Sequence, residues 1–183
     1  MKTICGIDYS MASPAITIHT GDEWNISNCK FYYLSKTGKI VVNDGVFHGQ
    51  LYPAGYTSEY SRYERLASWT LKNIIDNKVE KCYIEDYAFA ATGKVFHIAE
   101  NTGLMKYSLW NLGIPFETYA PTSIKKYATG KGNAKKEDLY AAWLTETGID
   151  IRASLGIKSQ VSWNPVSDIV DSYYIAKKGF YLG

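Results

Sequence analysis

The sequence predicts a mixed α/β fold, in which one sheet holds antiparallel and parallel strands and helices flank it. The first observation is a series of short β-prone segments separated by turns near the start of the chain, which is typical of an antiparallel meander. They are Ile4–Asp8, Ala15–His19 and Lys30–Leu34, with a further β-prone piece at Ile40–Val46. The second observation is a later alternation of short apolar runs with helical periodicity, which is typical of parallel strands covered by helices.

Each element after the meander has its own signal. Apolar residues recur at helical spacing in three segments. These are the predicted helices Glu59–Ile75, Val95–Leu112 and Lys136–Thr147. Short apolar runs at Cys82–Ile84 and Phe116–Tyr119 predict the later strands. We expect a last helix with Asn164 as N-cap, Pro165 at its first position and an end at Lys177-Lys178-Gly179.

Length and composition favour one globular domain over residues 1–183. The chain is 46% hydrophobic and 15% aromatic, which is enough to bury one core and excludes a disordered protein. No apolar run approaches the roughly 20 residues that cross a membrane, and the start of the chain lacks a signal-peptide pattern. The three cysteines are odd in number and lack metal-binding spacing. We therefore expect reduced core cysteines in an intracellular, cytoplasmic protein.

Acidic residues follow two of the predicted strands. Asp8 ends the first apolar run, and Glu85 and Asp86 come directly after Ile84. In open α/β sheets, functional sites gather at the carboxyl ends of strands, and neighbouring strands lie about 4.8 Å apart. If these two strands are adjacent and parallel, Asp8 and one of the later acids can hold one ion between them. The pattern alone does not choose between Glu85 and Asp86.

The last predicted helix carries a second pair of acids. Asp168 and Asp171 are three residues apart, which places them on one helical face. Four converging carboxylates require cations, and all-oxygen ligation selects magnesium or manganese over zinc. Two such ions are the usual arrangement for cutting a phosphodiester, with Asp8 as the expected bridge between them. Each acid taken alone also fits a simpler interpretation, as a turn residue or part of a solvated helix face.

The segment 125–136 is rich in lysine and contains no acidic residue. Its lysines are Lys125, Lys126, Lys131, Lys135 and Lys136. Phosphates attract such a cluster, and Gly130 and Gly132 let the backbone approach closely. Charge alone favours a solvated loop, whereas a neighbouring carboxylate site favours DNA binding. One of the last three lysines is also a candidate for neutralising charge at the scissile phosphate.

Taken in order, these residues give the chain a resemblance to the RuvC family of Holliday-junction resolvases, within the RNase H-like superfamily. The motifs that carry it are Gly6-Ile7-Asp8, Ile84-Glu85, Thr129-Gly130-Lys131-Gly132-Asn133-Ala134 and Pro165 through Asp168-Ile169-Val170-Asp171. The resemblance selects Glu85 over Asp86. It implies an RNase H-like mixed five-stranded sheet and two magnesium ions per site, with manganese as a substitute. It implies that the catalytic, metal-binding residues are Asp8, Glu85, Asp168 and Asp171.

The resemblance also implies partners and further DNA contacts. It implies a homodimer that nicks two opposed strands of a four-way junction in DNA recombination and repair, without a nucleotide cofactor. In the family, an aromatic residue after the second acid probes unstacked bases, which points first to Phe89 and second to Tyr87. Buried packing explains these two aromatic residues equally well. By the same resemblance, the helix at Val95–Leu112 lies at the dimer interface, although its composition also fits a core helix.

The chain departs from the cellular pattern in several places. Tyr9-Ser10 stands where the family usually has Pro-Gly, and Ser172 follows the last acid where alanine is usual. The stretches 23–60 and 149–163 look expanded relative to the family. Such changes are similar to those of divergent bacteriophage resolvases, which act in the cytoplasm of a bacterial host. They keep the four acids and leave the preferred cleavage sequence open.

Three other functions share part of this pattern. A related RNase H-like nuclease that cuts flaps or RNA would have the same fold and acids. A protein that holds branched DNA without cutting it would gain nothing from acids beside phosphate. An actin-like ATPase shares Gly6-Ile7-Asp8, but that fold normally needs two such domains and 183 residues are too few. The sequence therefore predicts a magnesium-dependent endonuclease for Holliday junctions and other branched DNA.

Overall fold

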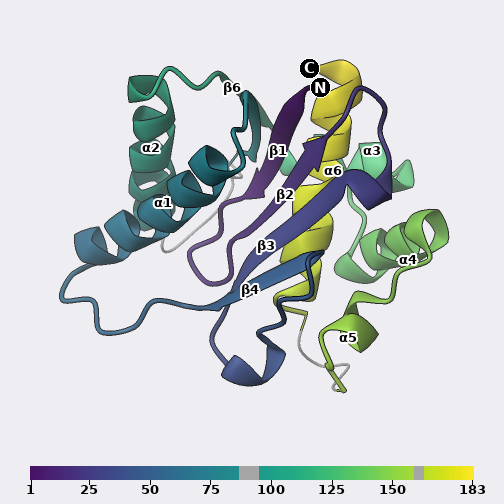
Figure 1. The fold of residues 1–183 in the computed structure, drawn as a ribbon, viewed down its shortest axis with the longest axis horizontal. Helices are drawn as coiled ribbons and strands as arrows, with labels where there is room; N and C mark the ends of the chain where they lie inside the picture. Colours follow the sequence, from purple (N-terminus) through teal and green to yellow (C-terminus); the bar gives the residue numbers. More distant parts are fainter. Residues whose placement is uncertain (87–94, 159–162) are drawn as a thin grey trace.

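The computed structural model describes residues 1–86, 95–158 and 163–183, which form one sheet with helices on both faces (Figure 1). The strands are β1 (Thr3–Asp8), β2 (Ala15–Thr20), β3 (Cys29–Ser35), β4 (Phe47–Leu51), β5 (Lys81–Glu85) and β6 (Phe116–Tyr119). Their order across the sheet is β4-β3-β2-β1-β5-β6. β2 pairs antiparallel with β1 and β3, whereas β5 pairs in parallel with β1 and β6. The predicted mixed α/β class is confirmed.

The sheet has six strands, one more than the five predicted, because β4 pairs in parallel with β3. The β-prone piece expected at Ile40–Val46 is not a strand. It overlaps the 3-10 turn η2 (Gly38–Ile40) at Ile40, and its backbone bonds both to a side chain and to single backbone groups of β3 and β4. The Tyr33 hydroxyl donates to the Ile40 carbonyl at 2.7 Å and accepts from the Val42 N–H at 3.0 Å. This crossing segment allows β4 to run in the same direction as β3.

The helices lie close to their predicted positions, with two exceptions. They are α1 (Glu59–Asp76), α2 (Val95–Asn111), α3 (Pro121–Thr129), α4 (Lys136–Thr147), α5 (Ile151–Ser154) and α6 (Val166–Leu182), with a 3-10 turn η1 (Ile26–Asn28). α3 was not predicted as a helix; it begins with Pro121 and ends at Gly130, whose φ is +79°. Among the described residues, no helix is both long and apolar enough to cross a membrane.

The end of α6 corrects a second prediction. Gly179 was expected to end the helix, but α6 continues to Leu182. A Cβ atom at Gly179 would lie 2.2 Å from the Tyr83 ring of β5. The glycine is therefore required for close packing of the helix on the sheet. At the other end, α6 begins one residue after Pro165, which takes the cap position expected for Asn164.

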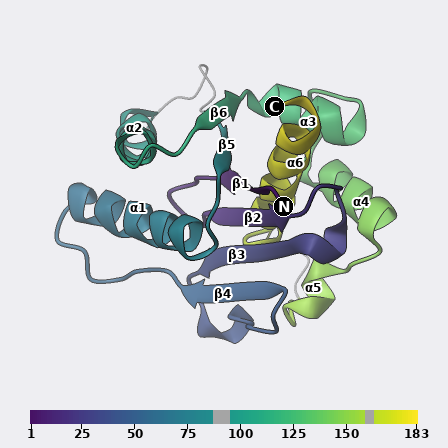
Figure 2. The same ribbon diagram turned by 45° about the horizontal axis from the view of Figure 1, so that its top comes forward.

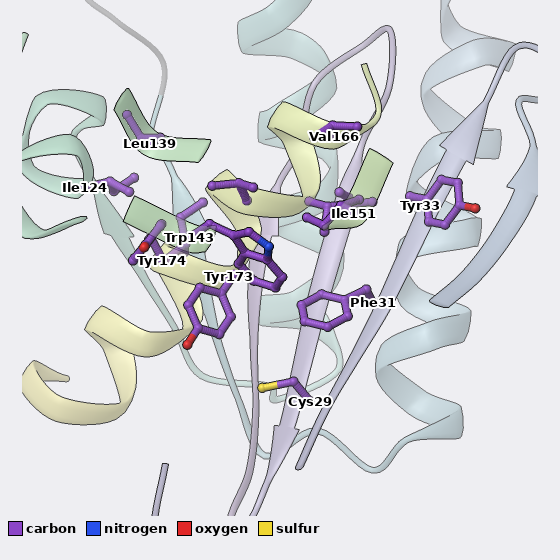
Figure 3. Close-up of a cluster of buried hydrophobic side chains, with 14 of the residues drawn as sticks. Cys29, Phe31, Tyr33, Ile124, Leu139, Trp143, Ile151, Val166, Tyr173 and Tyr174 are labelled. Carbon is purple, nitrogen blue, oxygen red and sulfur yellow. The ribbon is translucent and has the colours of Figure 1, made fainter. Parts of the chain in front are cut away.

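The sheet separates two hydrophobic cores (Figure 2). α1 and α2 cover one face, where residues such as Ile7 and Ile84 pack on Leu66 and Met105. α3, α4, α5 and α6 cover the other face. Figure 3 shows that second core, in which side chains of β3 meet those of α4 and α6. The Trp143 and Tyr173 rings lie 4.8 Å apart there, edge to face. The three cysteines are free and buried, as predicted.

Candidate active site

The carboxyl ends of β1 and β5 place Asp8 beside Glu85. The two strands are parallel neighbours, and Ile7 lies opposite Ile84 in their register. The next residue of each strand is therefore one of the predicted acids, and both reach the same edge of the sheet. Asp8 is buried, with 7% of its surface exposed. The condition set from the sequence, that these strands be adjacent and parallel, is confirmed.

α6 brings the second pair of acids to this edge because it packs directly on β1. A Cβ atom at Gly6 would lie 2.2 Å from the backbone nitrogen of Ala176 and 2.3 Å from the carbonyl oxygen of Ser172. The Thr17 and Ser172 hydroxyl oxygens, 2.8 Å apart, form a hydrogen bond that ties α6 to β2. In the first turns of the same helix, Asp168 is buried and forms a hydrogen bond with Asp8.

The four carboxyl groups share one electrostatic environment. Burial, followed by repulsion from the other three acids, raises the pKa of Asp8 well above its ordinary value. Burial and repulsion from Asp171 raise the pKa of Glu85 to about 8. Burial also raises the pKa of Asp168 to about 7 and that of Asp171 to about 6. Buried carboxyls that raise one another's pKa favour proton sharing or a bound cation.

Two lysines supply positive charge beside the acids. Lys125 of α3 and Lys136 of α4 line a cavity of about 160 Å³ together with Glu85 and Asp171. Lys125 opposes the rise in the pKa of Glu85, and both lysines oppose the rise in the pKa of Asp171. Lys136 has the same effect on Asp168. The cavity therefore places cationic groups next to the carboxylates, where a phosphate would need them.

The other three lysines of the predicted basic segment lie elsewhere. Lys126, Lys131 and Lys135 are exposed and do not line this cavity. The backbone N–H of Lys135 donates to Asp138 Oδ2 at 2.8 Å, which caps α4. Within the described residues, the segment thus divides into two lysines that line the cavity, the half-buried Lys125 and the exposed Lys136, and three exposed lysines that do not.

Asp86 has a different environment from its neighbour Glu85. Its carboxylate forms an ion pair with Lys106 of α2 at 3.2 Å, and its backbone N–H donates to the Tyr119 carbonyl at 2.9 Å. These contacts favour Glu85 as the second acid. The two aromatic candidates, Tyr87 and Phe89, lie outside the described residues.

Two serines that the sequence did not single out also contact the site. A hydrogen bond from Ser13 lowers the pKa of Asp168, against the effect of burial. The Ser13 N–H donates to Ser10 Oγ at 3.0 Å, which closes the loop between β1 and β2. Ser167 Oγ accepts from Lys136 Nζ at 3.2 Å. Neither serine carried a functional signal in the sequence.

The donor set suits a hard divalent cation, although no metal site is preformed. In the ranges 1–86, 95–158 and 163–183, no three His, Cys, Asp or Glu side chains form a group that could hold a metal ion as they lie. The four acids nevertheless offer only oxygen donors. Asp168 Oδ2 is buried and has no hydrogen-bond partner within these ranges. A buried, unpaired oxygen among like charges is stabilised by a cation, so the residues fit such an ion after side-chain rotation.

Comparison with known proteins gives structural neighbours only. No protein-family model matches the sequence, and no curated protein sequence matches it. RuvC of Thermus thermophilus in complex with a Holliday junction substrate has a TM-score of 0.62 and 17% identity, over 99% of this chain and 94% of that one. The yeast mitochondrial Holliday junction resolvase Ydc2 has a TM-score of 0.57 and 14% identity, over 98% of this chain and 78% of that one. The Fowlpox virus resolvase, in complex with substrate Holliday junction DNA, has a TM-score of 0.51 and 12% identity, over 98% of this chain and 97% of that one. The chain has the RuvC fold.

The RuvC fold confirms the resemblance that the motifs predicted. At identities of 12–17%, the likeness to RuvC and the other resolvases shows the fold alone. The position of the four acids on the RuvC fold comes from the contacts described above, at the ends of β1 and β5 and the start of α6. Their chemical roles are therefore inferred from their own geometry and charge.

Proposed function

We propose that this protein is a structure-selective DNA endonuclease that cuts four-way junctions and related branched DNA. One observation carries the proposal: four carboxyls from β1, β5 and α6, two of them buried and two half-buried, converge, and two lysines of α3 and α4 stand beside them. Acids alone would repel a phosphodiester, whereas acids with lysines and cations can bind and cut it. The solved resolvases with this fold include two whose complexes contain Holliday junction DNA, which supports a branched substrate.

We propose that Asp8, Glu85, Asp168 and Asp171 hold two magnesium ions, and that manganese can replace them. Asp8 is the expected shared ligand because it is the acid that the other three all influence. When bound, the ions supply an activated water and charge stabilisation for the leaving 3′ oxygen. The chain's own part is to hold the four carboxyls together, and Ser13 opposes the rise in the pKa of Asp168.

The lysines of the same segment have two proposed tasks. Lys125 and Lys136 contact the oxygens of the phosphate that is cut, since they line the cavity with Glu85 and Asp171. Lys126, Lys131 and Lys135 are exposed outside the cavity and contact flanking phosphates, which fixes the position of the DNA without reading its sequence. Cleavage is therefore expected to be more sensitive to the pair that lines the cavity, and salt-dependent binding to the three lysines outside it.

We further propose that two copies pair through α2 and make paired nicks in opposed strands. α2 exposes several large apolar side chains in the described structure: Phe96, Leu104, Tyr107 and Trp110. Trp110 is 70% and Phe96 78% exposed, which is unusual for side chains of this size. Sedimentation of the protein and of a Trp110→Glu variant tests the pairing. A dimer that the substitution dissociates supports it, and a monomeric starting protein contradicts it.

The test of the function uses purified protein, magnesium and a synthetic four-way junction. Cleavage that yields ligatable ends is expected, and Asp8→Asn should abolish cutting while leaving junction binding intact. Flap, plain duplex and RNA substrates of matched length serve as comparisons. Equal cutting of duplex and junction would remove the branch-specific part of the proposal. Preference for RNA or flaps would assign the site to a different nuclease of this fold.

A second candidate function is binding of branched DNA without cleavage. The observation that favours it is the absence, in the described part of the chain, of three acids already placed to hold a metal ion. Junction binding that needs no magnesium, with no products over long incubation in magnesium or manganese, would support this candidate against the endonuclease.

A further inference from the structure

Part of the cavity wall beside the acids is not used by the proposed chemistry. Lys125, Lys136, Glu85 and Asp171 are the charged residues that line the cavity. The apolar and aromatic part of the wall is made by Pro121, Leu139, Tyr140 and Val170. A cavity lined by both charged and apolar groups suits a ligand that carries both.

The Tyr140 ring in this wall is held in place from outside the cavity. Its hydroxyl donates to Asp150 Oδ1 at 2.8 Å and accepts from the backbone N–H of Arg152 at 3.3 Å. The Arg152 guanidinium lies over the ring, 5.9 Å from its centre, and the Trp163 ring meets it edge to face at 5.9 Å. All three partners belong to the segment between α4 and α6. This connecting segment therefore fixes one aromatic ring beside the acids.

We propose that Tyr140 is a stacking site for the nucleobase next to the phosphate that is cut. The proposal rests on the proposed function, since it takes the charged residues of the cavity as the place of that phosphate. Charge complementarity then selects the occupant. A phosphate bound by Lys125 and Lys136 carries its own sugar and base, and the base needs an apolar surface within reach of the same cavity.

The fixed ring makes such a contact effective. A ring that is already ordered by Asp150, Arg152 and Trp163 loses little conformational freedom when a base stacks on it. Base stacking on an aromatic side chain contributes between about 5-fold and 150-fold to affinity. It also tolerates different bases, because every base has a π-face. The site would thus hold one unstacked nucleotide without requiring one particular sequence.

An abasic scan of the junction tests this site. Single abasic nucleotides are moved along the cut strand, and single-turnover cleavage by the wild-type protein is compared with that by Tyr140→Ala and Tyr140→Phe. Tyr181→Ala is the matched control, because Tyr181 is 57% exposed at the opposite end of α6 from the acids. Folding of each variant is checked by its thermal transition.

The expected result is coupling at one nucleotide beside the cut. At that nucleotide, the abasic change should slow cleavage by the wild-type protein, Tyr140→Phe and Tyr181→Ala by about 5-fold or more. Tyr140→Ala should cleave the abasic junction as slowly as the intact one, because its stacking contact is already lost. If the abasic change and Tyr140→Ala slowed cleavage independently of each other at every position, the stacking site would be overturned, even if Tyr140→Ala were slow or unstable. Absence of any wild-type cleavage of the intact junction would instead overturn the proposed function, so the two failures are distinguishable.

Discussion

Gly6 of β1 lies against the backbone of Ala176 in α6, with space for a hydrogen atom and nothing larger. A Cβ atom at Gly6 would be 2.2 Å from the Ala176 nitrogen and 2.8 Å from its Cα. Both contacts are to backbone, which cannot rotate away as a side chain can. The contact therefore sets the distance between α6 and β1, and with it the meeting of Asp168 and Asp8. The glycine of the Gly-Ile-Asp motif is a packing requirement of the acid site.

Gly6→Ala should displace α6 from the sheet. We expect a loss on the order of 3 kcal/mol in the free energy of unfolding, measured by urea denaturation, because the added methyl group overpacks a rigid contact. Gly103→Ala is the matched control, since Gly103 is an exposed position of α2 with no atom near an added Cβ. It should be stabilising by about 0.5–1 kcal/mol. Equal effects of the two substitutions would contradict the packing explanation.

Lys136 and Lys126 belong to the same basic segment but should behave differently. Lys136→Ala removes a cation from the cavity that holds Glu85 and Asp171, so we expect cleavage of a junction to slow by about 10²-fold or more. Lys126→Ala changes an exposed lysine and should mainly weaken binding, with a shallower dependence of affinity on salt. Single-turnover rates and binding isotherms at two salt concentrations separate the two effects. Similar profiles for both variants would argue against distinct roles for lysines that line the cavity and lysines outside it.

The sequence predicted the parts of this protein in which local pattern and long-range packing agree. Apolar runs that end in acid gave β1 and β5, and helical periodicity gave α1, α2 and α4 nearly to the residue. Side-chain contacts across the chain could not be predicted this way. The piece at Ile40–Val46 has strand-like composition, but the Tyr33 hydroxyl bonds to the Ile40 carbonyl and the Val42 N–H. α3 was not predicted because its nine residues are too few to show a clear helical periodicity.

The site shows the same division. The four acids and the basic segment could be chosen from strand ends, helical spacing and the motif resemblance. The sequence could not show which lysines line the cavity, because that depends on how α3 and α4 pack on α6. Ser13 and Tyr140 carry no sequence signal, because their contacts are with side chains or backbone groups ten or more positions away.

Arg62 should stabilise the loop that follows Asp8. Its guanidinium donates to the Met11 carbonyl at 2.7 Å and to the Tyr52 hydroxyl at 2.8 Å. Arg62→Lys loses this two-point geometry, and we expect it to lower the free energy of unfolding by about 1.5–3 kcal/mol. Glu64→Gln, at an exposed position of the same helix, should stay within about 0.5 kcal/mol of the wild type. Urea denaturation of both variants is the measurement, and a difference smaller than its error would contradict this role for Arg62.

The raised pKa values of the four acids predict how pH acts on the metal-free protein. Folding raises the pKa of Glu85 to about 8, of Asp168 to about 7 and of Asp171 to about 6. Between its unfolded and folded pKa values, each group binds more protons in the folded protein than in the unfolded chain. The free energy of unfolding must then fall as the pH rises through that window, from about 4 to about 8.

Magnesium should reverse this loss if, as proposed, it binds the deprotonated acids of the folded protein. We expect the metal-free protein to lose about 1 kcal/mol or more between pH 5 and pH 8, and magnesium to stabilise it more at pH 8 than at pH 5. Asp171→Asn removes one titrating group and should flatten the profile, whereas Asp76→Asn, at the end of α1, should leave it unchanged. Thermal and urea unfolding with and without magnesium provide the data. A metal-free stability that rises from pH 5 to pH 8, and is insensitive to Asp171→Asn, would show that these acids are not buried together as charged groups.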